Sequence, residues 1–352
     1  MSIRPGAFAR GVRLEQNKEP AYSREIKRLP FPEGQQPRTR PQGPDGYTPA
    51  ADLSALMPQQ VIRLARLAGI VDENDGRPLW EKLEEAQKRS IYAVVVDAID
   101  DEPYLSSQLN PMLKHGKEIV TALRLCARAV SASKQYVAVY KHLTDLSITI
   151  PRYVDDVRIK RIRGKYPAEF RSRYLFGEDR KVLLIGACAL LFLYRAASEG
   201  QAQSTAIVTV HGDCVANPIN LEVPLGADAQ QVLEFCGLAQ NPDRVVAGGP
   251  MTGQEIDDPA AYHITPTTRA ILAFKDPARL RRWDCIGCSR CTAVCPAGIS
   301  PCFIYRRENY GHLTDGDRED ARRCTSCGAC SYACPAGLPL TGAVLSAARR
   351  DG

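Results

Sequence analysis

Histidine motifs and nucleophile motifs are missing from this 352-residue chain. It contains neither an H-E-x-x-H pair of zinc ligands nor the elbow that carries a serine nucleophile. The five histidines show no metal-ligand spacing: His115, His142, His211, His263 and His312. We therefore assign no catalytic residue from the sequence.

An apolar segment that could act as a secretory signal or cross a bilayer is also missing. The amino terminus has no apolar signal region, and the longest apolar run, Val182–Tyr194, is too short for a span. We interpret that run as a buried helix. We expect a cytoplasmic protein without a membrane span, and leave open a place beside a membrane complex or inside a bacterial microcompartment.

The excess of positive charge is small. A formal net charge of +6 is far below that of a dedicated nucleic-acid binder, so we expect no nucleic-acid partner. Residues 152–180 are locally basic, which is compatible with docking of an acidic redox partner or a nucleotide phosphate. A solvated charged face explains the same stretch equally simply.

Cysteine is plentiful, and eight of the thirteen cysteines form two copies of the pattern C-x-x-C-x-x-C-x-x-x-C-P. The first run has Cys285, Cys288, Cys291 and Cys295, and the second has Cys324, Cys327, Cys330 and Cys334. This is the spacing of two-cluster ferredoxins, in which the fourth cysteine of each run binds the other cluster. Zinc sites or disulfides do not need eight cysteines in this register.

We therefore predict two 4Fe-4S clusters. Cluster 1 is assigned to Cys285, Cys288, Cys291 and Cys334, and cluster 2 to Cys324, Cys327, Cys330 and Cys295. Cys126 and Cys188 lie in apolar stretches and are expected to be buried, whereas Cys302 is expected to line the cluster pocket.

The rest of the chain divides by composition and periodicity. Residues 1–50, with eight prolines and five glycines, predict a flexible basic extension. Residues 51–200 predict an α/β domain with a helix ending near Gly69, and its other expected elements are strands at 91–96 and 136–140 and helices at 111–132 and 181–198.

Residues 201–262 predict a compact α+β module. Its expected elements are strands at 206–210, 220–223 and 244–247 and a helix at 228–236 that is capped by Asp228. The module ends in the glycine-rich run 248–253. Without the Lys-Ser/Thr of a phosphate-binding loop, this run is interpreted as a structural turn.

These motifs carry a family resemblance that spans roughly residues 60–345. The glycine-rich run, the stretch Thr268–Phe274 and the two cysteine runs resemble the C subunit of the Rnf electron-transport complex. They are also similar to the cobalamin reductase of propanediol-utilising microcompartments. Both are relatives of the flavin-bearing, NADH-oxidising subunit of respiratory complex I. Asp101–Leu105 and Leu67–Val71 extend the match upstream.

The resemblance implies an α/β plus α+β fold. It comprises a Rossmann-like flavin domain at 51–200, a β-grasp module of the SLBB kind at 201–262 and a helical two-cluster ferredoxin-like domain at 263–352. It further implies electron flow from NADH through FMN to the clusters.

Three segments depart from the flavin pattern of that family. Asp72–Trp80 replaces a glycine-rich loop that ends in Gly-Phe-Pro, and Asp97–Pro103 keeps only Glu102 and Pro103 of Asn-x-x-Glu-Cys-Glu-Pro. Tyr166–Arg171 has lost the glycines of Tyr-Pro-x-Gly-Gly-Glu. Acidic side chains repel a phosphate, so these changes argue against FMN.

The sequence thus favours an electron relay between a partner reductase, flavoprotein, ferredoxin or flavodoxin and a downstream acceptor. Two alternatives stay open: a reductase dependent on NADH or flavin, similar to the cobalamin reductase, and a cluster-bearing scaffold protein. The sequence leaves undecided whether the chain is an enzyme by itself or an electron-transfer subunit of an oxidoreductase system.

Overall fold

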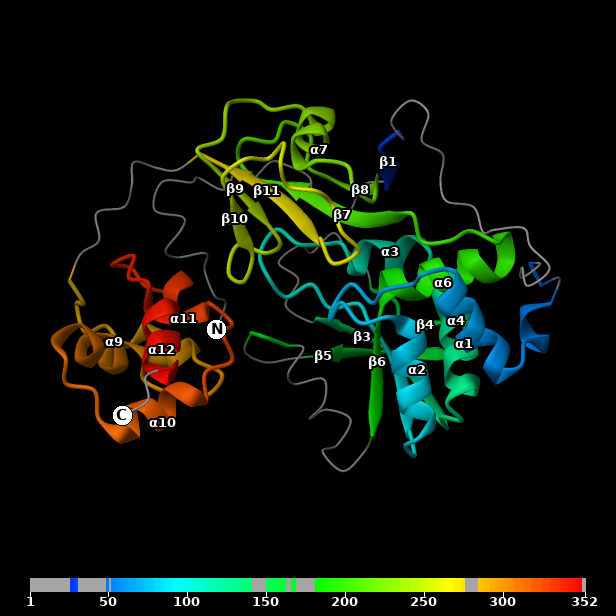
Figure 1. The fold of residues 1–352 in the computed structure, drawn as a ribbon, viewed down its shortest axis with the longest axis horizontal. Helices are drawn as coiled ribbons and strands as arrows, with labels where there is room; N and C mark the ends of the chain where they lie inside the picture. The colour runs from blue at the N-terminus through cyan, green and yellow to red at the C-terminus, as the bar shows by residue number, and fades with distance from the viewer. Residues whose placement is uncertain are drawn as a thin grey trace.

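A computed structural model describes residues 26–30, 49–50, 52–140, 150–162, 166–168, 181–275 and 284–349. The protein is a mixed α/β structure with two sheets and a separate group of helices near the carboxyl end (Figure 1). Most of the predicted extension 1–50, and part of the basic stretch 152–180, lie outside the described residues.

The first sheet has five strands in the order β4-β5-β3-β2-β6. Its strands are β2 (Ala93–Asp97), β3 (Lys134–Tyr140), β4 (Tyr153–Val154), β5 (Val157–Ile162) and β6 (Val182–Gly186). All neighbours are parallel except the short edge strand β4. Every residue of the inner strand β2 is buried, as expected for a parallel sheet.

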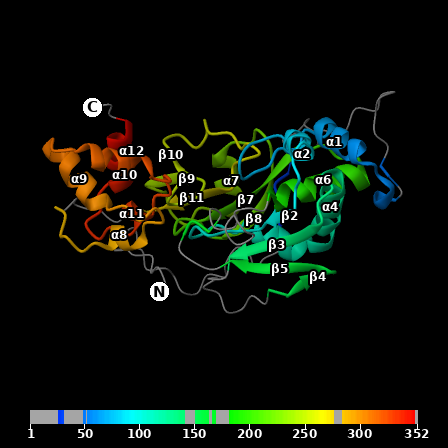
Figure 2. The ribbon, with the colours of Figure 1, turned by 90° about the horizontal axis from the view of Figure 1, so that it is seen from below.

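Helices cover one face of this sheet (Figure 2). They are η2 (Leu53–Ala55), α1 (Pro58–Leu67), α2 (Leu79–Gln87), α3 (Leu109–Lys114), α4 (Gly116–Ala129) and α6 (Ala187–Glu199). The main core lies between α1, α2, α4, α6 and the side chains of Val94, Val96 and Val137.

Two predicted helices are wrong in part. The stretch 181–198 begins with the strand β6 and becomes helical only at α6, because its apolar residues lie beside β2 in the sheet, with Leu184 opposite Val95. A short apolar run is compatible with either structure until its neighbours are known. The stretch 111–132 is divided into α3 and α4 at His115, whose backbone is not helical.

The second sheet has six strands in the order β1-β8-β7-β11-β9-β10. They are β1 (Lys27–Arg28), β7 (Thr205–His211), β8 (Ile219–Pro224), β9 (Arg244–Ala247), β10 (Gln254–Ile256) and β11 (Ala270–Phe274), with α7 (Ala229–Cys236) packed against them. Asp228 caps α7 as predicted, accepting from the Gln231 N–H at 2.7 Å. β11 pairs with β7 and β9 and so belongs to this sheet. The sequence prediction placed these residues in the dicluster domain, which was expected to begin at residue 263.

The pairing of β1 with β8 corrects part of the predicted flexible extension. Leu29 is buried in the core of the second sheet, and the Arg28 guanidinium donates to Glu222 of β8 at 2.9 Å. A partner 194 positions away leaves no signal in the local composition, on which the prediction of flexibility rested.

Glu222 joins three elements through one carboxylate oxygen. Its Oε1 accepts from Arg28, from Arg195 of α6 at 2.8 Å and from the Thr205 hydroxyl of β7 at 2.9 Å. Burial opposes ionisation, but the charges of Arg195 and Arg28 more than offset it and hold the pKa of Glu222 below its ordinary value. This oxygen therefore ties α6 to the second sheet.

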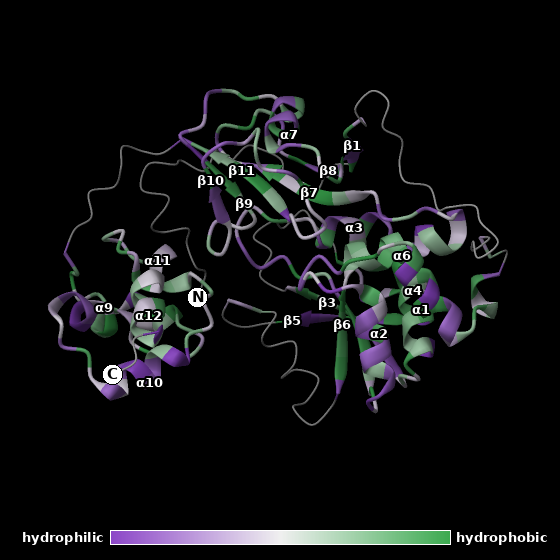
Figure 3. Cartoon of the chain, viewed as in Figure 1, coloured by the Kyte–Doolittle hydropathy of each residue, from purple (hydrophilic) through white to green (hydrophobic). Residues whose placement is uncertain are grey.

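The carboxyl-terminal helices are short. They are α8 (Arg290–Val294), α9 (Pro301–Tyr310), α10 (Asp315–Arg322), α11 (Ala329–Tyr332) and α12 (Leu340–Arg349). Figure 3 shows α10 as hydrophilic, in contrast to the hydrophobic strand β6. No helix within the described ranges is long and apolar enough to cross a membrane.

The Glu222 junction predicts a loss of stability on truncation. Glu222→Ala leaves Arg195 partly buried without this carboxylate. This should cost roughly 3 kcal/mol, at the low end for breaking a buried pair because both arginines keep some contact with water. The check is anaerobic urea unfolding at pH 7, with exposed Glu199→Ala on α6 as the control. Equal midpoints for the two variants would contradict the role given to Glu222.

Candidate functional site

The second cysteine of each run lies between two residues with left-handed backbone conformation. Gly287 and Ser289 flank Cys288, and their φ angles are 69° and 54°; Ser326 and Gly328 flank Cys327 with φ of 58° and 70°. One left-handed residue on each side of a cysteine bends the chain sharply around a small volume. This is the local geometry that several thiolates need to approach one cluster.

The structure brings the fourth cysteine of each run toward the other run. Cys334 lies in one buried group with Cys285, Cys291 and Cys330, whereas Cys295 and Cys324 pack against another group. Cys302 lies buried in the group that contains Cys334, where the sequence predicted it to line the pocket. Because Cys330, which is assigned to cluster 2, lies in the same group as Cys285 and Cys291, this grouping does not separate the two predicted ligand sets, and the assignment of each ligand stays a prediction.

The doubled cysteine spacing predicts clusters and not single metal ions. Within the described residues, no three His, Cys, Asp or Glu side chains form a group that could hold a metal ion. The ligands of a cubane bind four different irons and stand around a larger volume. Burial raises the pKa of Cys291 to about 12 and that of Cys330 to about 11, so these thiolates need the positive charge of bound metal.

The two runs differ in exposure. In the first run, residues 286–290 are exposed, including Cys288, and the Ile286 side chain is 66% exposed. In the second run, residues 327–330 are buried, and Cys327 packs against Tyr166 and Met251. One end of the cysteine constellation therefore faces solvent and the other faces the rest of the chain.

The acidic loop that replaces the expected flavin loop is tied down by a buried lysine. Lys82 of α2 donates to Asp72 at 2.6 Å and to Asp75 at 2.8 Å, and Asp72 is fully buried. Sequence reasoning missed Lys82. Its position within the stripe of buried residues Leu79, Leu83 and Ala86 on α2 was the available signal.

Side chains of the acidic loop, together with Gln108, accept hydrogen bonds from the backbone N–H groups at the amino end of α6. Glu73 accepts from the N–H of Cys188 at 2.9 Å and of Ala189 at 3.0 Å. The Gln108 side chain accepts from Ala187 N–H at 3.1 Å, and Asp72 accepts from Gly186 N–H at 3.1 Å. Four consecutive amides, at 186–189, thus donate to side chains of this chain.

These contacts bear on whether a flavin phosphate fits. Amides at a helix amino terminus are the groups that bind a phosphate, and here they already have acceptors. A Cβ atom at Gly186 would lie 2.1 Å from the Glu73 carboxylate, so the acid fills the space beside the backbone. At this end of α6 the residues present do not fit a phosphate. This supports the prediction made from the acidic loop.

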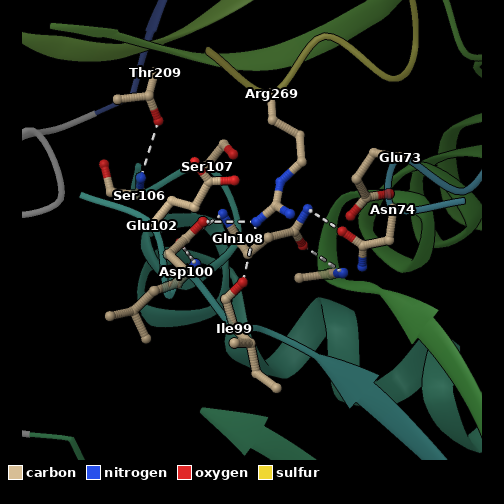
Figure 4. Close-up of polar contacts among 12 residues, drawn as sticks. Glu73, Asn74, Ile99, Asp100, Glu102, Ser106, Ser107, Gln108, Thr209 and Arg269 are labelled. Carbon is tan, nitrogen blue, oxygen red and sulfur yellow. Dashed lines mark hydrogen bonds and ion pairs between the residues drawn. The ribbon is translucent and has the colours of Figure 1, made fainter. Parts of the chain in front are cut away.

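The altered Asp97–Pro103 segment joins the two sheets. Buried Asp100 accepts from the N–H of Gln108 at 3.0 Å and of Leu109 at 2.7 Å, and from Arg269 at 3.0 Å. Figure 4 shows Arg269 reaching toward Asp100 and Ile99, with the bond from Ser106 to Thr209 beside it. The polar groups of Asp100 and Arg269 thus connect the segment after β2 with the segment before β11.

The glycine-rich run forms a turn, as predicted, but it also holds an anionic group. The Glu102 carboxylate accepts from the N–H of Met251 at 2.8 Å. Sequence reasoning weighed a phosphate for this run and did not consider a carboxylate from the same chain. Of the third altered segment, Tyr166, Pro167 and Ala168 lie within the described residues.

Glu73 predicts an unusual pH dependence of stability. Burial, and next the charge of Asp72, raises the pKa of Glu73 from 4.5 to about 7. The folded state then binds a proton that the unfolded state releases, so this group's contribution falls as pH rises from 4.5 to 7, by on the order of 3 kcal/mol. Anaerobic unfolding at pH 5, 6, 7 and 8 should show this slope in the wild type and lose it in Glu73→Gln. A slope that persists in the variant would assign it to another group.

Family models match three successive parts of the chain. Residues 62–178 match the Nuo51 FMN-binding domain, residues 207–255 the SLBB domain and residues 284–338 the 4Fe-4S dicluster domain. The chain therefore carries a dicluster domain of the type that binds iron-sulfur clusters, downstream of a domain of the flavin-binding type.

Curated relatives and a solved structure are similar to most of this chain. The C subunit of an ion-translocating oxidoreductase complex from Rhodobacter capsulatus is 27% identical over 298 residues, which cover 78% of this chain and 57% of the relative. The C subunit of the Na(+)-translocating ferredoxin:NAD(+) oxidoreductase complex from Acetobacterium woodii is 25% identical, over 73% of this chain and 62% of the relative.

The chain thus spans less than two thirds of these relatives' length. A chain of an NAD+-reducing [NiFe]-hydrogenase shares the fold, with a TM-score of 0.57 and 15% identity over 86% of this chain and 64% of that one. The comparisons confirm the resemblance of this chain to the C subunits of the Rnf-type ion-translocating oxidoreductase complexes.

Proposed function

We propose that this chain is an iron-sulfur electron-transfer protein. It relays single electrons through two 4Fe-4S clusters between a partner reductase, flavoprotein, flavodoxin or ferredoxin and a downstream acceptor, without FMN of its own. The observation that carries the proposal is the doubled cysteine run, with left-handed residues on both sides of Cys288 and Cys327.

In this proposal, Cys285, Cys288, Cys291 and Cys334 hold one cluster, and Cys324, Cys327, Cys330 and Cys295 hold the other. When bound, each cluster supplies a reversible one-electron carrier. The protein's own part is to fix the thiolates, to bury four of the eight cysteines and to leave Cys288 of the first run accessible to a partner.

The finer architecture belongs to the same proposal. We assign the parallel sheet and its helices, residues 51–200, to a Rossmann-like domain that has lost its flavin site. The six-stranded sheet is built around a β-grasp module at 201–262, and the dicluster domain occupies 263–352 apart from β11.

The absence of FMN is proposed because the polar groups around α6 have partners within the chain. Glu73, Asp72 and Gln108 accept from the amides at 186–189. A phosphate would have to displace buried carboxylates and would meet their charge.

The match to an FMN-binding domain favours a second candidate, a flavin-dependent reductase that binds its cofactor elsewhere in the domain. A third candidate is a scaffold whose clusters are structural. Relatives named as parts of a complex support assembly of this chain into a larger complex, and we place it there rather than in a microcompartment.

Iron and acid-released flavin, measured on one anaerobically purified sample, distinguish these functions. We expect about eight iron atoms per chain, four for each cluster, and no stoichiometric flavin. One flavin per chain would overturn the flavin-free relay and favour the reductase. Iron far below eight would remove the basis of the relay itself.

Substitutions in the two runs test the relay against the scaffold. Cys288→Ser and Cys327→Ser should each remove one cluster, halve the iron content and abolish transfer between dithionite-reduced ferredoxin and a dye acceptor. Cys126→Ala, at a buried cysteine of α4, is the matched control and should keep both clusters. Loss of stability with unchanged electron transfer would instead indicate a scaffold.

A further inference from the structure

One carboxylate, that of Glu102, lies at the junction between the dicluster helices and the rest of the chain. Its Oε2 accepts from the N–H of Met251 at 2.8 Å and of Thr252 at 3.3 Å, and its Oε1 accepts from the Thr252 hydroxyl. A Cβ atom at Gly249 would lie 2.0 Å from Oε2, so only glycine leaves room for this acid. The turn 248–253 is folded around Glu102.

The same turn contacts the second cysteine run. The Met251 carbonyl oxygen lies so close to Gly328 that a Cβ atom there would be 2.1 Å from it. Gly328 follows Cys327 directly and has a φ of 70°, so this contact needs glycine for both space and backbone conformation. Met251 also packs with Cys327. Glu102 is therefore linked to the second run through the backbone of a single residue.

Two buried tyrosines complete the junction. Tyr166 is 4% exposed, packs against Cys327 and lies where the charge of Glu102 acts on it. Tyr332 of α11 is 3% exposed and lies where the charge of Glu102 acts on it. The second run is thus covered by side chains that gather around Glu102, whereas Cys288 of the first run is exposed.

We propose that Glu102 is a positioning residue for the second cluster. It holds the turn 248–253 against Cys327 and Gly328, excludes water from this side of cluster 2 and sets that cluster's reduction potential apart from that of cluster 1. The inference rests on the proposed function. Its physical basis is that cluster potentials follow local charge, hydrogen bonding and solvent exposure.

The test is a redox titration of both clusters, followed by electron paramagnetic resonance, in Glu102→Gln and Thr252→Val. Loss of the negative charge and entry of water both stabilise the added electron, so Glu102→Gln should shift one transition to higher potential. Thr252→Val removes one donor to Glu102 and should shift the same transition less. Ile286→Lys, at an exposed position next to Cys285, places a cation near cluster 1 and identifies the other transition.

Glu199→Gln, far from the junction and exposed, is the matched control and should move neither transition. Unchanged potentials in Glu102→Gln, or an equal shift of both transitions, would overturn the proposal. If Glu102→Gln loses iron, Thr252→Val decides by the same criterion.

Amide hydrogen exchange separates this proposal from the proposed function. Glu102→Gln should speed exchange at residues 251–253 and 327–332 and leave α4 unchanged, whether or not clusters are bound. A wild-type chain without iron would defeat the relay, while unchanged exchange at these segments would defeat the role of Glu102.

Discussion

The backbone amides at the amino end of α6 need acceptors, and the chain supplies them from its own side chains. Glu73, Asp72 and Gln108 come from two segments that are far from α6 in the sequence. Because these acceptors are buried, they bind the loops to α6 and fix the packing of the α/β domain. The helix terminus has become part of the core.

A second carboxylate follows the same principle at the same edge of the sheet, where β2 ends beside β6. Glu102 occupies the glycine-rich turn, and Asp100 next to it accepts from two amides and Arg269. In both places backbone donors that could bind a ligand instead bind an acid of the protein. The α/β domain thereby serves as a platform on which the second sheet and the second cysteine run rest.

The features that could be predicted from the sequence are those that depend on residues close together in the chain. Cysteine spacing, the Asp228 cap and the strand predicted at 91–96 depend on local patterns; the structure shows the cap, and it shows the strand at 93–97. The strand β6 and the pairing of β1 were missed because their partners are distant in sequence. The acidic residues at 72 and 73 argued against a bound phosphate, but they did not predict that Glu73 would accept from α6 amides over 100 positions away.

The difference in exposure between the two runs also bears on damage by oxygen. Oxidants arrive from solvent, and they meet the exposed Cys288 before they reach the thiols beneath Tyr166 and Met251. Cluster 1, to which Cys288 is assigned in the proposed ligand set, would therefore be lost first in air, and cluster 2 would persist longer.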